Sequence, residues 1–333
     1  MEFVRRIGRG LKKFGLDWFI ASILLAVVVA ALLPAKGAGE QAVNWISIAG
    51  IAMLFFLYGT RMSPRETLEG LRHWRLHLTV TVFTFVLFPI LGLLGQFALT
   101  PLLGTGLAAG LLFLTLVPST VQSSISFVSI SRGNIPAAIV SASASNLIGV
   151  FVTPLLVIAL MSATSGVHID GSSVLKIFAQ LLLPYVLGQL CRRWVLPLTD
   201  RIGPRISLFD KAVIVVVVYS AFSEAVAEGM FSQITWAEAG WLVLVCCVLL
   251  AIVLSLSALA GRLFGFSVAD QRVVQFCGSK KSLATGMPMA AVLFAGQPIG
   301  LLVLPLMIFH QIQLIVCAWM ANRYGREYDA AHA

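Results

Sequence analysis

The sequence predicts an all-α, polytopic membrane protein with ten transmembrane helices arranged as two inverted five-helix repeats. Three observations support this fold class. Of the 333 residues, 59% are hydrophobic and 11% are charged, and the mean hydropathy is +0.95. A soluble protein of this size needs more charges on its surface. In addition, the apolar runs divide into ten segments, and basic residues gather in alternate connections between them.

The ten apolar segments mostly approach the roughly 20 residues that cross the hydrocarbon core of a bilayer. They cover about residues 17–34, 43–60, 77–98, 105–131, 136–162, 173–191, 209–227, 238–261, 271–295 and 298–321. The fourth and ninth are longer and contain helix breakers. Basic residues before the first segment and small residues after it also fit a cleaved signal peptide. The distribution of basic residues favours a first segment that is kept as a transmembrane helix and is not cleaved.

Basic residues fall mainly on one side of this arrangement. Of the 23 lysines and arginines, 19 lie in or beside one alternating set of segments: 1–16, 61–76, 132–135, 192–208, 262–270 and the tail 322–333. The other side holds Lys36 and Lys176, which leaves Lys280 and Lys281 inside a span. Cytoplasmic connections are enriched in lysine and arginine. We therefore expect both termini in the cytoplasm, insertion in the cytoplasmic (inner) membrane, and no nucleic-acid partner despite the net charge of +9.

An even number of spans permits two halves of five, 17–162 and 173–321. Because five is odd, the halves would have opposite orientations, which is the plan of many secondary transporters. A short echo between them supports this division. Span four contains Pro118-Ser-Thr-Val-Gln-Ser-Ser and span nine contains Gly278-Ser-Lys-Lys-Ser. An echo of this length also arises by chance.

Lys280 and Lys281 are the most unusual residues of span nine. A lysine near the bilayer centre costs roughly 2.5–3.5 kcal/mol on insertion scales. Gly278, Gly286 and Pro288 flank the pair and predict an interrupted helix, and such breaks form ion and substrate sites in transporters. The structural alternative is that one lysine extends to the interface while the other bonds helix-end carbonyls.

Further polar residues lie in spans four, five and ten. Pro118 removes a backbone hydrogen bond and frees carbonyls at a break in span four. We expect residues 118–124 to form a site, although small serines also permit close helix packing. A buried His310 either relays protons or simply bonds across helices. The candidate site residues are Ser119, Thr120, Gln122, Ser123, Ser124, Asn146, Ser279, Lys280, Lys281, Ser282, Thr285, His310 and Gln311.

The sequence contains no catalytic signature, so we do not expect an enzyme. A Gly-x-Ser-x-Gly elbow, a Walker loop and His-Glu-x-x-His are all absent. The five cysteines show neither metal-ligand nor disulfide spacing. No cofactor and no catalytic metal is expected.

Four motifs carry a family resemblance: Val117-Pro-Ser-Thr-Val-Gln-Ser-Ser, Ser131-Arg-Gly-Asn, Gly278-Ser-Lys-Lys-Ser-Leu-Ala-Thr-Gly and Phe309-His-Gln. They resemble the bile acid/sodium symporter superfamily, solute carrier family ten, and within it the divergent branch of member seven and bacterial YfeH-type proteins. Length and span count match over essentially the whole chain. The resemblance implies panel helices at 17–60 and 173–227, core helices at 77–162 and 238–321, and crossed, broken spans four and nine. It also implies alternating access between panel and core.

The family's sodium ligands carry over incompletely. Its Ser-Asn pair is matched by Ser123 and Ser124, and its span-three glutamine falls at Thr84, which joins the candidate site residues. In span nine, Glu-x-Gly-x-Gln-Asn becomes Phe276-Cys-Gly-Ser-Lys-Lys, so the acid is missing and two cations replace the amides. The resemblance therefore implies at most a vestigial sodium site near Ser123 and Ser124, and sodium coupling is left open.

The leading hypothesis is a secondary transporter of a small organic solute, expected to be an anion. One lysine would pair with the substrate, exchange a proton, or replace a bound sodium as a built-in positive charge. The expected partners are the small-molecule substrate and the lipid bilayer, with a monomer and a homodimer both open. Eukaryotic relatives in this branch are linked to calcium homeostasis, so the alternative is a regulatory membrane protein affecting ion homeostasis.

Overall fold

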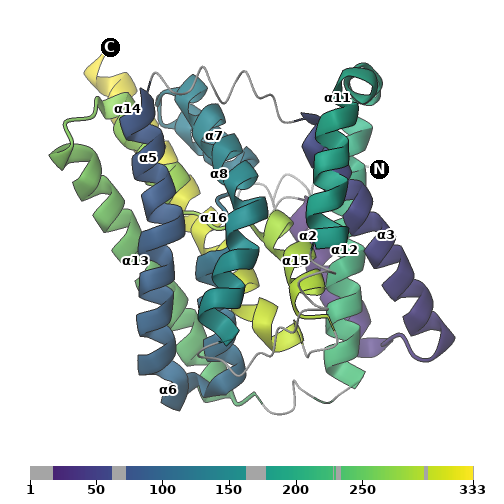
Figure 1. The fold of residues 1–333 in the computed structure, drawn as a ribbon. Coiled ribbons are helices and arrows are strands. Elements are labelled where there is room, and N and C mark those ends of the chain that lie inside the picture. Colours follow the sequence, from purple (N-terminus) through teal and green to yellow (C-terminus); the bar gives the residue numbers. More distant parts are fainter. Residues whose placement is uncertain are drawn as a thin grey trace, which may run out of the picture. The chain divides into compact units, whose positions relative to one another are not determined.

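The computed structural model describes residues 18–61, 73–162, 178–227, 229, 234–295 and 299–332, and within these ranges the chain is helical without strands (Figure 1). Two compact units are each built from separate stretches of chain. Unit 1 comprises 1–62, 170–234 and 287–301, and unit 2 comprises 63–169, 235–286 and 302–333. The expected N-terminal segment 1–16, Lys176 and most of the connection 61–76 lie outside the described residues.

Unit 1 is a cluster of closely packed helices. Its elements are α2 (Trp18–Leu32), α3 (Ala38–Arg61), η4 (Phe178–Leu182), α11 (Leu183–Ile202) and α12 (Pro204–Ala227). Helix α11 packs along α3, and α12 packs on α2 and α3. Gly59 and Gly188 make the first of these contacts possible, because a Cβ at either position would collide with a carbonyl oxygen of the other helix. Small residues permit the same close approach in many membrane helix pairs.

Unit 2 contains the two helix breaks. Its elements are α5 (Trp74–Val82), η2 (Phe83–Leu87), α6 (Phe88–Leu116), α7 (Gln122–Ile130), α8 (Ile135–Leu156), η3 (Val157–Met161), α13 (Trp236–Leu263), α14 (Val268–Gly278) and most of α16 (Ile299–Ala331). Helix α15 (Leu283–Leu293) begins in unit 2 and ends in unit 1. Within α6, Gly104 has a φ of 70° and marks a kink where the expected third and fourth segments meet.

Side chains cap three helix starts in unit 2. The Asn134 carboxamide oxygen accepts from the Ala137 amide at the start of α8, and the Ser267 hydroxyl accepts from the Asp270 amide at the start of α14. At the start of α13, Thr235 and Glu238 form a reciprocal capping box. These residues satisfy amides that have no partner within their own helix.

Each of the ten expected segments overlaps a described helix, and the predicted interruptions of the fourth and ninth are confirmed at 117–121 and 279–282. Gly286 and Pro288 lie inside α15 and do not form the break, which ends before Leu283. Five described helical segments are long and apolar enough to cross a membrane: Ala38–Arg61, Trp74–Leu116, Ile135–Met161, Trp236–Leu263 and Ile299–Ala331. The count of ten spans and the inverted repeats remain predictions.

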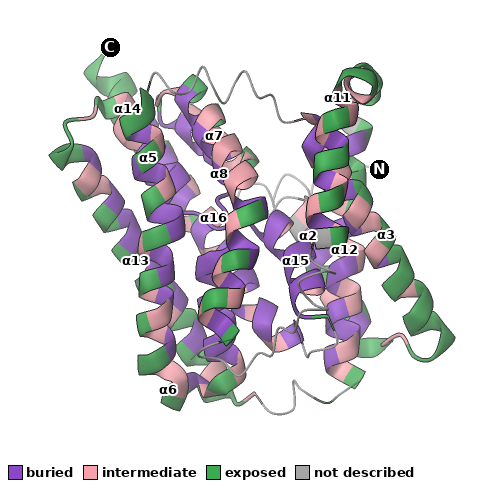
Figure 2. Cartoon of the chain, in the orientation of Figure 1, coloured by how far each residue is buried: buried purple, intermediate pink, exposed green. Residues whose placement is uncertain are grey.

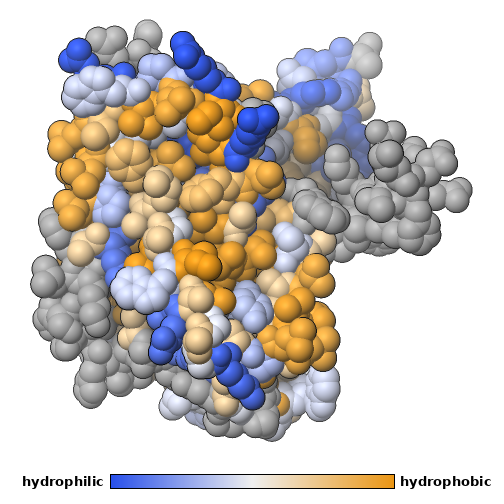
Figure 3. Space-filling model, turned by 90° about the vertical axis from the view of Figure 1, so that its right-hand side faces the viewer, coloured by the Kyte–Doolittle hydropathy of each residue, from blue (hydrophilic) through white to orange (hydrophobic). Residues whose placement is uncertain are grey.

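The surface is that of an integral membrane protein. Large apolar side chains are exposed on several helices, among them Leu155 at 64% and Leu190 at 67%. The face shown in Figure 3 carries many hydrophobic side chains, with hydrophilic ones near its upper edge and a few more in its lower half. Figure 2 shows α13 with a clearly exposed face, whereas α15 is buried along most of its length. Soluble monomers rarely expose apolar patches of this extent.

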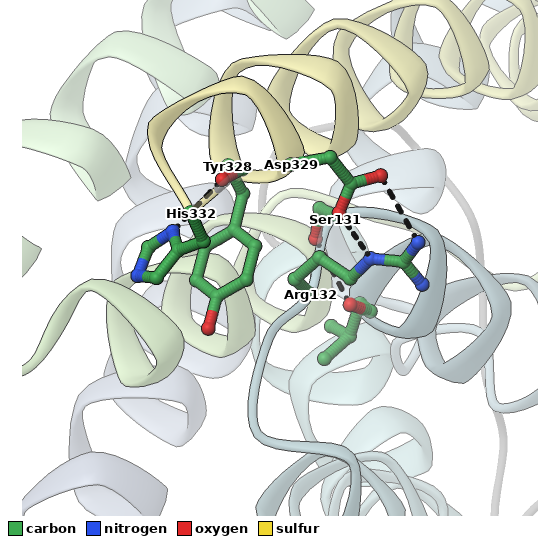
Figure 4. A network of polar contacts seen from close by, with 6 residues as sticks. Ser131, Arg132, Tyr328, Asp329 and His332 are labelled. Atoms are coloured by element: carbon green, nitrogen blue, oxygen red, sulfur yellow. Dashed lines mark hydrogen bonds and ion pairs between the residues drawn. The ribbon is translucent and has the colours of Figure 1, made fainter.

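The C-terminal part of α16 is fastened to the turn between α7 and α8 (Figure 4). Arg132, whose φ is 59°, donates from Nε and from a terminal guanidinium nitrogen to the two carboxylate oxygens of Asp329, at 3.0 and 3.1 Å. These hydrogen bonds raise the pKa of Arg132. Gly325 permits the approach, since a Cβ there would collide with the Ile130 carbonyl oxygen. Helix α16 thus continues past the expected end of its span at 321 and packs on unit 2.

Candidate functional site

The two helix breaks of unit 2 are bonded directly to each other. The Ser282 amide donates to the Pro118 carbonyl at 2.8 Å, and the Ser119 hydroxyl donates to the Cys277 carbonyl at 2.6 Å. In the first turn of α7, the Ser124 hydroxyl donates to the Phe276 carbonyl at 3.1 Å. Residues from the fourth and ninth segments are therefore joined at the points where their helices are interrupted.

Lys281 is fully buried at this junction and its side chain is held by three carbonyl oxygens. Its Nζ donates to Thr84 at 2.9 Å, to Thr115 at 2.7 Å and to Val117 at 2.8 Å. Three donated hydrogen bonds require three hydrogens, so this geometry fits the ammonium form. The Phe88 ring lies 4.2 Å from the same nitrogen and closes the cage with an aromatic face.

Local backbone structure explains why the Thr84 carbonyl is available. In η2, the Phe88 amide donates to Phe83 and so does not reach Thr84 in the α-helical register. In the π-helical register the partner of Thr84 would be Pro89, which has no N–H. The Thr84 carbonyl is therefore left without a helical donor, and Lys281 supplies one. The Thr84 hydroxyl takes no part, because it donates back to Val80.

Carbonyls released at the end of α6 and in the break that follows it are paired by other segments. Helix-terminal carbonyls have no intrahelical donor and must be satisfied elsewhere. Lys281 binds those of Thr115 and Val117, while the Thr153 hydroxyl donates to Leu116 at 2.8 Å. Asn146 donates from Nδ2 to the Ser119 carbonyl at 2.8 Å. The first break is thus held open by side chains from α8 and by the second break.

The backbone of Lys281 is fixed by Gln313 of α16. The Lys281 amide donates to Gln313 Oε1 at 2.9 Å, and Gln313 Nε2 donates to the Lys281 carbonyl at 2.8 Å. Gln313 Nε2 is also 2.8 Å from His310 Nδ1, whereas that ring nitrogen is 3.2 Å from the Lys281 carbonyl. The shorter contact favours a His310 tautomer that accepts at Nδ1 from Gln313 and carries its proton on Nε2.

Lys280 has the opposite environment, although it is the adjacent residue and is equally buried. Its Nζ has no hydrogen-bond partner among the described residues. The nitrogen lies 3.7 Å from the centre of the Phe127 ring and 5.7 Å from that of Phe276. No acidic side chain of the described residues contacts either lysine. An unpaired buried cation is strongly unfavourable. Among the described residues, no hydrogen bond offsets the cost of burying the Lys280 ammonium group.

Most remaining candidates lie in the same polar cluster. Thr120, Ser123 and Ser124 bond one another through their hydroxyls, at 2.7 and 2.9 Å. Thr285 bonds both Ser282 and Asn146, which links α15 to α8. Ser279, which follows the last residue of α14, bonds the Gln275 carbonyl of that helix.

Two candidates lie apart from this cluster, and several partners were not predicted. Gln122 is exposed at the start of α7, and Gln311 is only half-buried and makes none of these hydrogen bonds. Gln313 takes the place expected for Gln311, because it shares the face of His310 three residues earlier. Thr153, Phe88 and Phe127 also escaped prediction, since threonine and phenylalanine are ordinary in membrane helices.

The described residues do not supply a metal centre. They contain no group of three or more His, Cys, Asp or Glu side chains placed to hold an ion. The hydroxyls of Ser123 and Ser124, the expected remnant of a sodium site, bond Thr120 and the Phe276 carbonyl. The site is therefore built from carbonyls, hydroxyls and amides around two buried lysines.

Comparisons with known proteins agree over nearly the whole chain. Residues 17–326 match the SBF-like CPA transporter family. An uncharacterized protein of Pseudomonas aeruginosa is 47% identical, and the match covers 95% of each chain. The symporter-named protein YfeH of Escherichia coli K12 is 46% identical over 96% of each chain. Sodium/bile acid cotransporter 7 of Danio rerio is 30% identical over 92% of this chain and 95% of its own length.

Proposed function

We propose, from the premise that this chain belongs to the SBF-like CPA transporter family, that it carries a small organic anion across the cytoplasmic membrane by alternating access. Its relatives are named as a symporter and as sodium/bile acid cotransporters, which supports a carrier and not an enzyme. These names give no added support to a regulatory role. The excess of basic residues on one side supports cytoplasmic termini.

The carbonyl cage of Lys281 is the observation that carries the proposal. In transporters with broken helices, unwound carbonyls and helix C-termini coordinate the coupling cation. Here the carbonyls of Thr115 and Val117, at the end of α6, and of Thr84 bind the Lys281 ammonium instead. The described residues do not fit a sodium ion at this position, because the three carbonyl oxygens already bind Lys281 and no described carboxylate accompanies them. As an ammonium ion, Lys281 then supplies a positive charge that is covalently part of the protein, and transport does not require sodium.

We assign to Lys280 the charge that binds the substrate anion or is lost as a proton during transport. A cation buried without a hydrogen-bond acceptor gains strongly from any anion that reaches it. A substrate carboxylate or sulfonate in contact with Nζ would supply that partner. When no anion is present, loss of the ammonium proton removes the unpaired charge. The same group can therefore bind the substrate, carry a proton, or couple both events.

The proposal is tested first by ligand screening of the purified full-length protein in detergent. Small carboxylates, sulfonates and their neutral amide analogues are compared by thermal shift at several pH values, in sodium and in choline salts. We expect stabilisation by some anions, none by their amides, and equal stabilisation in both salts. Lys280→Ala is expected to abolish the anion effect while retaining the unliganded melting temperature.

Reconstitution in liposomes then tests whether an anion that binds is also transported. Uptake of the labelled anion should be saturable, should not need a sodium gradient, and should be lost in Lys280→Ala. An absolute requirement for sodium would contradict the built-in cation. Binding without uptake by the protein alone would contradict a carrier and favour the regulatory alternative. Unchanged anion binding in both Lys280→Ala and Lys281→Ala would show that neither lysine takes part in the binding site.

A further inference from the structure

A polar cavity, unrelated to the lysine pair, lies within unit 1. It has a volume of about 200 Å³, and every described residue that lines it belongs to that unit. Its walls come from α3, η4, α12 and the stretch that includes Ala291–Ala295. A cavity of about 150 Å³ is large enough for benzene. The space therefore suits a small organic molecule.

The polar lining is acidic. Glu40 at the start of α3 and Glu224 near the end of α12 both face this cavity, together with the amides Asn44 and Gln180. Among the described lining residues there is no lysine, arginine or histidine, although Lys36 follows the lining residue Ala35 along the chain. Carboxylates with amide and hydroxyl oxygens favour a cation and disfavour the anions proposed for the lysine pair.

An unsatisfied buried hydroxyl points to a ligand in the same cavity. Ser47 lies on α3, lines the cavity, and is only 5% exposed, yet its Oγ has no hydrogen-bond partner among the described residues. Buried hydroxyls are nearly always paired. A ligand N–H group entering the cavity would find an acceptor at this position, beside the carboxylate charge.

Apolar side chains form much of the remaining wall, beside Ser220 and Ser223, and indicate what the cation carries. Ile48, Ile51, Val217 and Val292 are among the lining residues. Small-molecule sites commonly combine an apolar wall with a few polar groups that fix orientation. A bare metal ion would leave this apolar surface without a partner, and the described residues hold no group of three or more acidic or imidazole ligands.

We propose that unit 1 contains a second ligand site that binds a small organic ammonium ion, with its charged end at Glu40 and Glu224, an N–H directed to Ser47, and its apolar body against Ile48 and Ile51. This site is independent of the proposed anion transport. It gives the protein two sites of opposite charge preference. A transported or regulatory amine would be recognised here and not at the lysine pair.

Benzylammonium is a suitable probe, with benzyl alcohol and benzoate as isosteres of different charge. Binding to the full-length protein in detergent is measured by thermal shift and calorimetry at constant ionic strength. We expect binding of benzylammonium only, weakened at least tenfold in Glu40→Gln and in Ser47→Val. Glu40 is exposed, so its replacement should not disturb folding. Lys280→Ala, outside unit 1, should leave benzylammonium binding unchanged.

Three outcomes would overturn the proposal. If benzyl alcohol binds with the same affinity as benzylammonium, the cavity is an apolar space that does not select for charge. Full benzylammonium affinity in a Glu40→Gln, Glu224→Gln double variant would place the amine elsewhere. Loss of benzylammonium binding in Lys280→Ala would show that the amine site depends on the lysine pair and is not a separate site. None of these outcomes changes the anion and sodium tests of the lysine pair, so the two proposals fail separately.

Discussion

Replacement of each lysine by methionine separates the two buried ammonium groups by their energetic roles. Both side chains are 0% exposed and adjacent in sequence, so the two variants are matched in size change and burial. Lys281→Met removes three charge-assisted hydrogen bonds and leaves three buried carbonyls without donors. An unsatisfied buried polar group costs about 1–3 kcal/mol, so the three together cost at least about 3 kcal/mol. Lys280→Met removes no hydrogen bond.

For Lys280 the balance has the opposite sign. The lost cation–π contact with Phe127 contributes up to about 2 kcal/mol when desolvated. An unpaired buried ion, however, costs several kcal/mol. Lys280→Met should therefore match or exceed the stability of the native protein, while Lys281→Met should lose about 3 kcal/mol or more.

Thermal unfolding in detergent, followed by size-exclusion chromatography of heated samples, measures this difference. At about 2–4 °C per kcal/mol, Lys281→Met should unfold at least about 6 °C below the native protein. Lys280→Met should unfold at or above the native temperature. If Lys281→Met is as stable as the native protein, the carbonyl cage does not hold a charged donor. If Lys280→Met is the less stable variant, the assignment of the two roles is reversed.

Three further predictions test the same structure. If Lys281 stands in for a coupling cation, Lys281→Ala should be stabilised by sodium chloride relative to choline chloride, and no difference between the salts would leave the lysine a purely structural role. Gln313→Leu leaves the Lys281 amide without a partner and its carbonyl with only the 3.2 Å contact from His310, so thermal unfolding should shift down by the equivalent of about 1 kcal/mol or more. An unchanged melting temperature would exclude this clamp. Gly188→Ala should destabilise the protein, because the added Cβ collides with the Phe56 carbonyl oxygen. Gly240→Ala meets nothing within 4 Å and should raise the free energy of unfolding by up to about 1 kcal/mol. Equal effects of the two variants on melting temperature would contradict close packing of α3 on α11.

The helix breaks were predictable because their chemistry is local. Proline in an apolar run and two lysines in another predict interruptions, and both occur near the expected residues. Gly286 and Pro288 misled, since both lie inside α15 and Pro288 removes one helical hydrogen bond without ending the helix. The sequence Thr84 to Pro89 also contained a usable signal, because a proline five residues after a carbonyl removes its donor in a π-helical turn.

The division of labour between Lys280 and Lys281 was not predictable from sequence. Residues 279–282 are irregular, so no helical period fixes which side chain faces which neighbour. The choice of Gln313 over Gln311 was within reach, because residues three apart share a helix face and residues one apart do not. The acidic cavity of unit 1 depends on α3, η4 and α12 meeting in space, and pairing of distant helices leaves no local pattern in the chain.

The unequal pairing of the two lysines limits which of them can respond to a ligand. Lys281 already donates all three of its hydrogens, so a substrate anion could reach it only by displacing backbone carbonyls. Lys280 has every donor free among the described residues and gains from the first acceptor that arrives. A transport cycle needs a group whose surroundings differ between states, because a ligand shifts an equilibrium only through differential affinity. Lys280 meets this requirement and Lys281 does not, and loss of anion binding in Lys280→Ala but not in Lys281→Arg would distinguish the two.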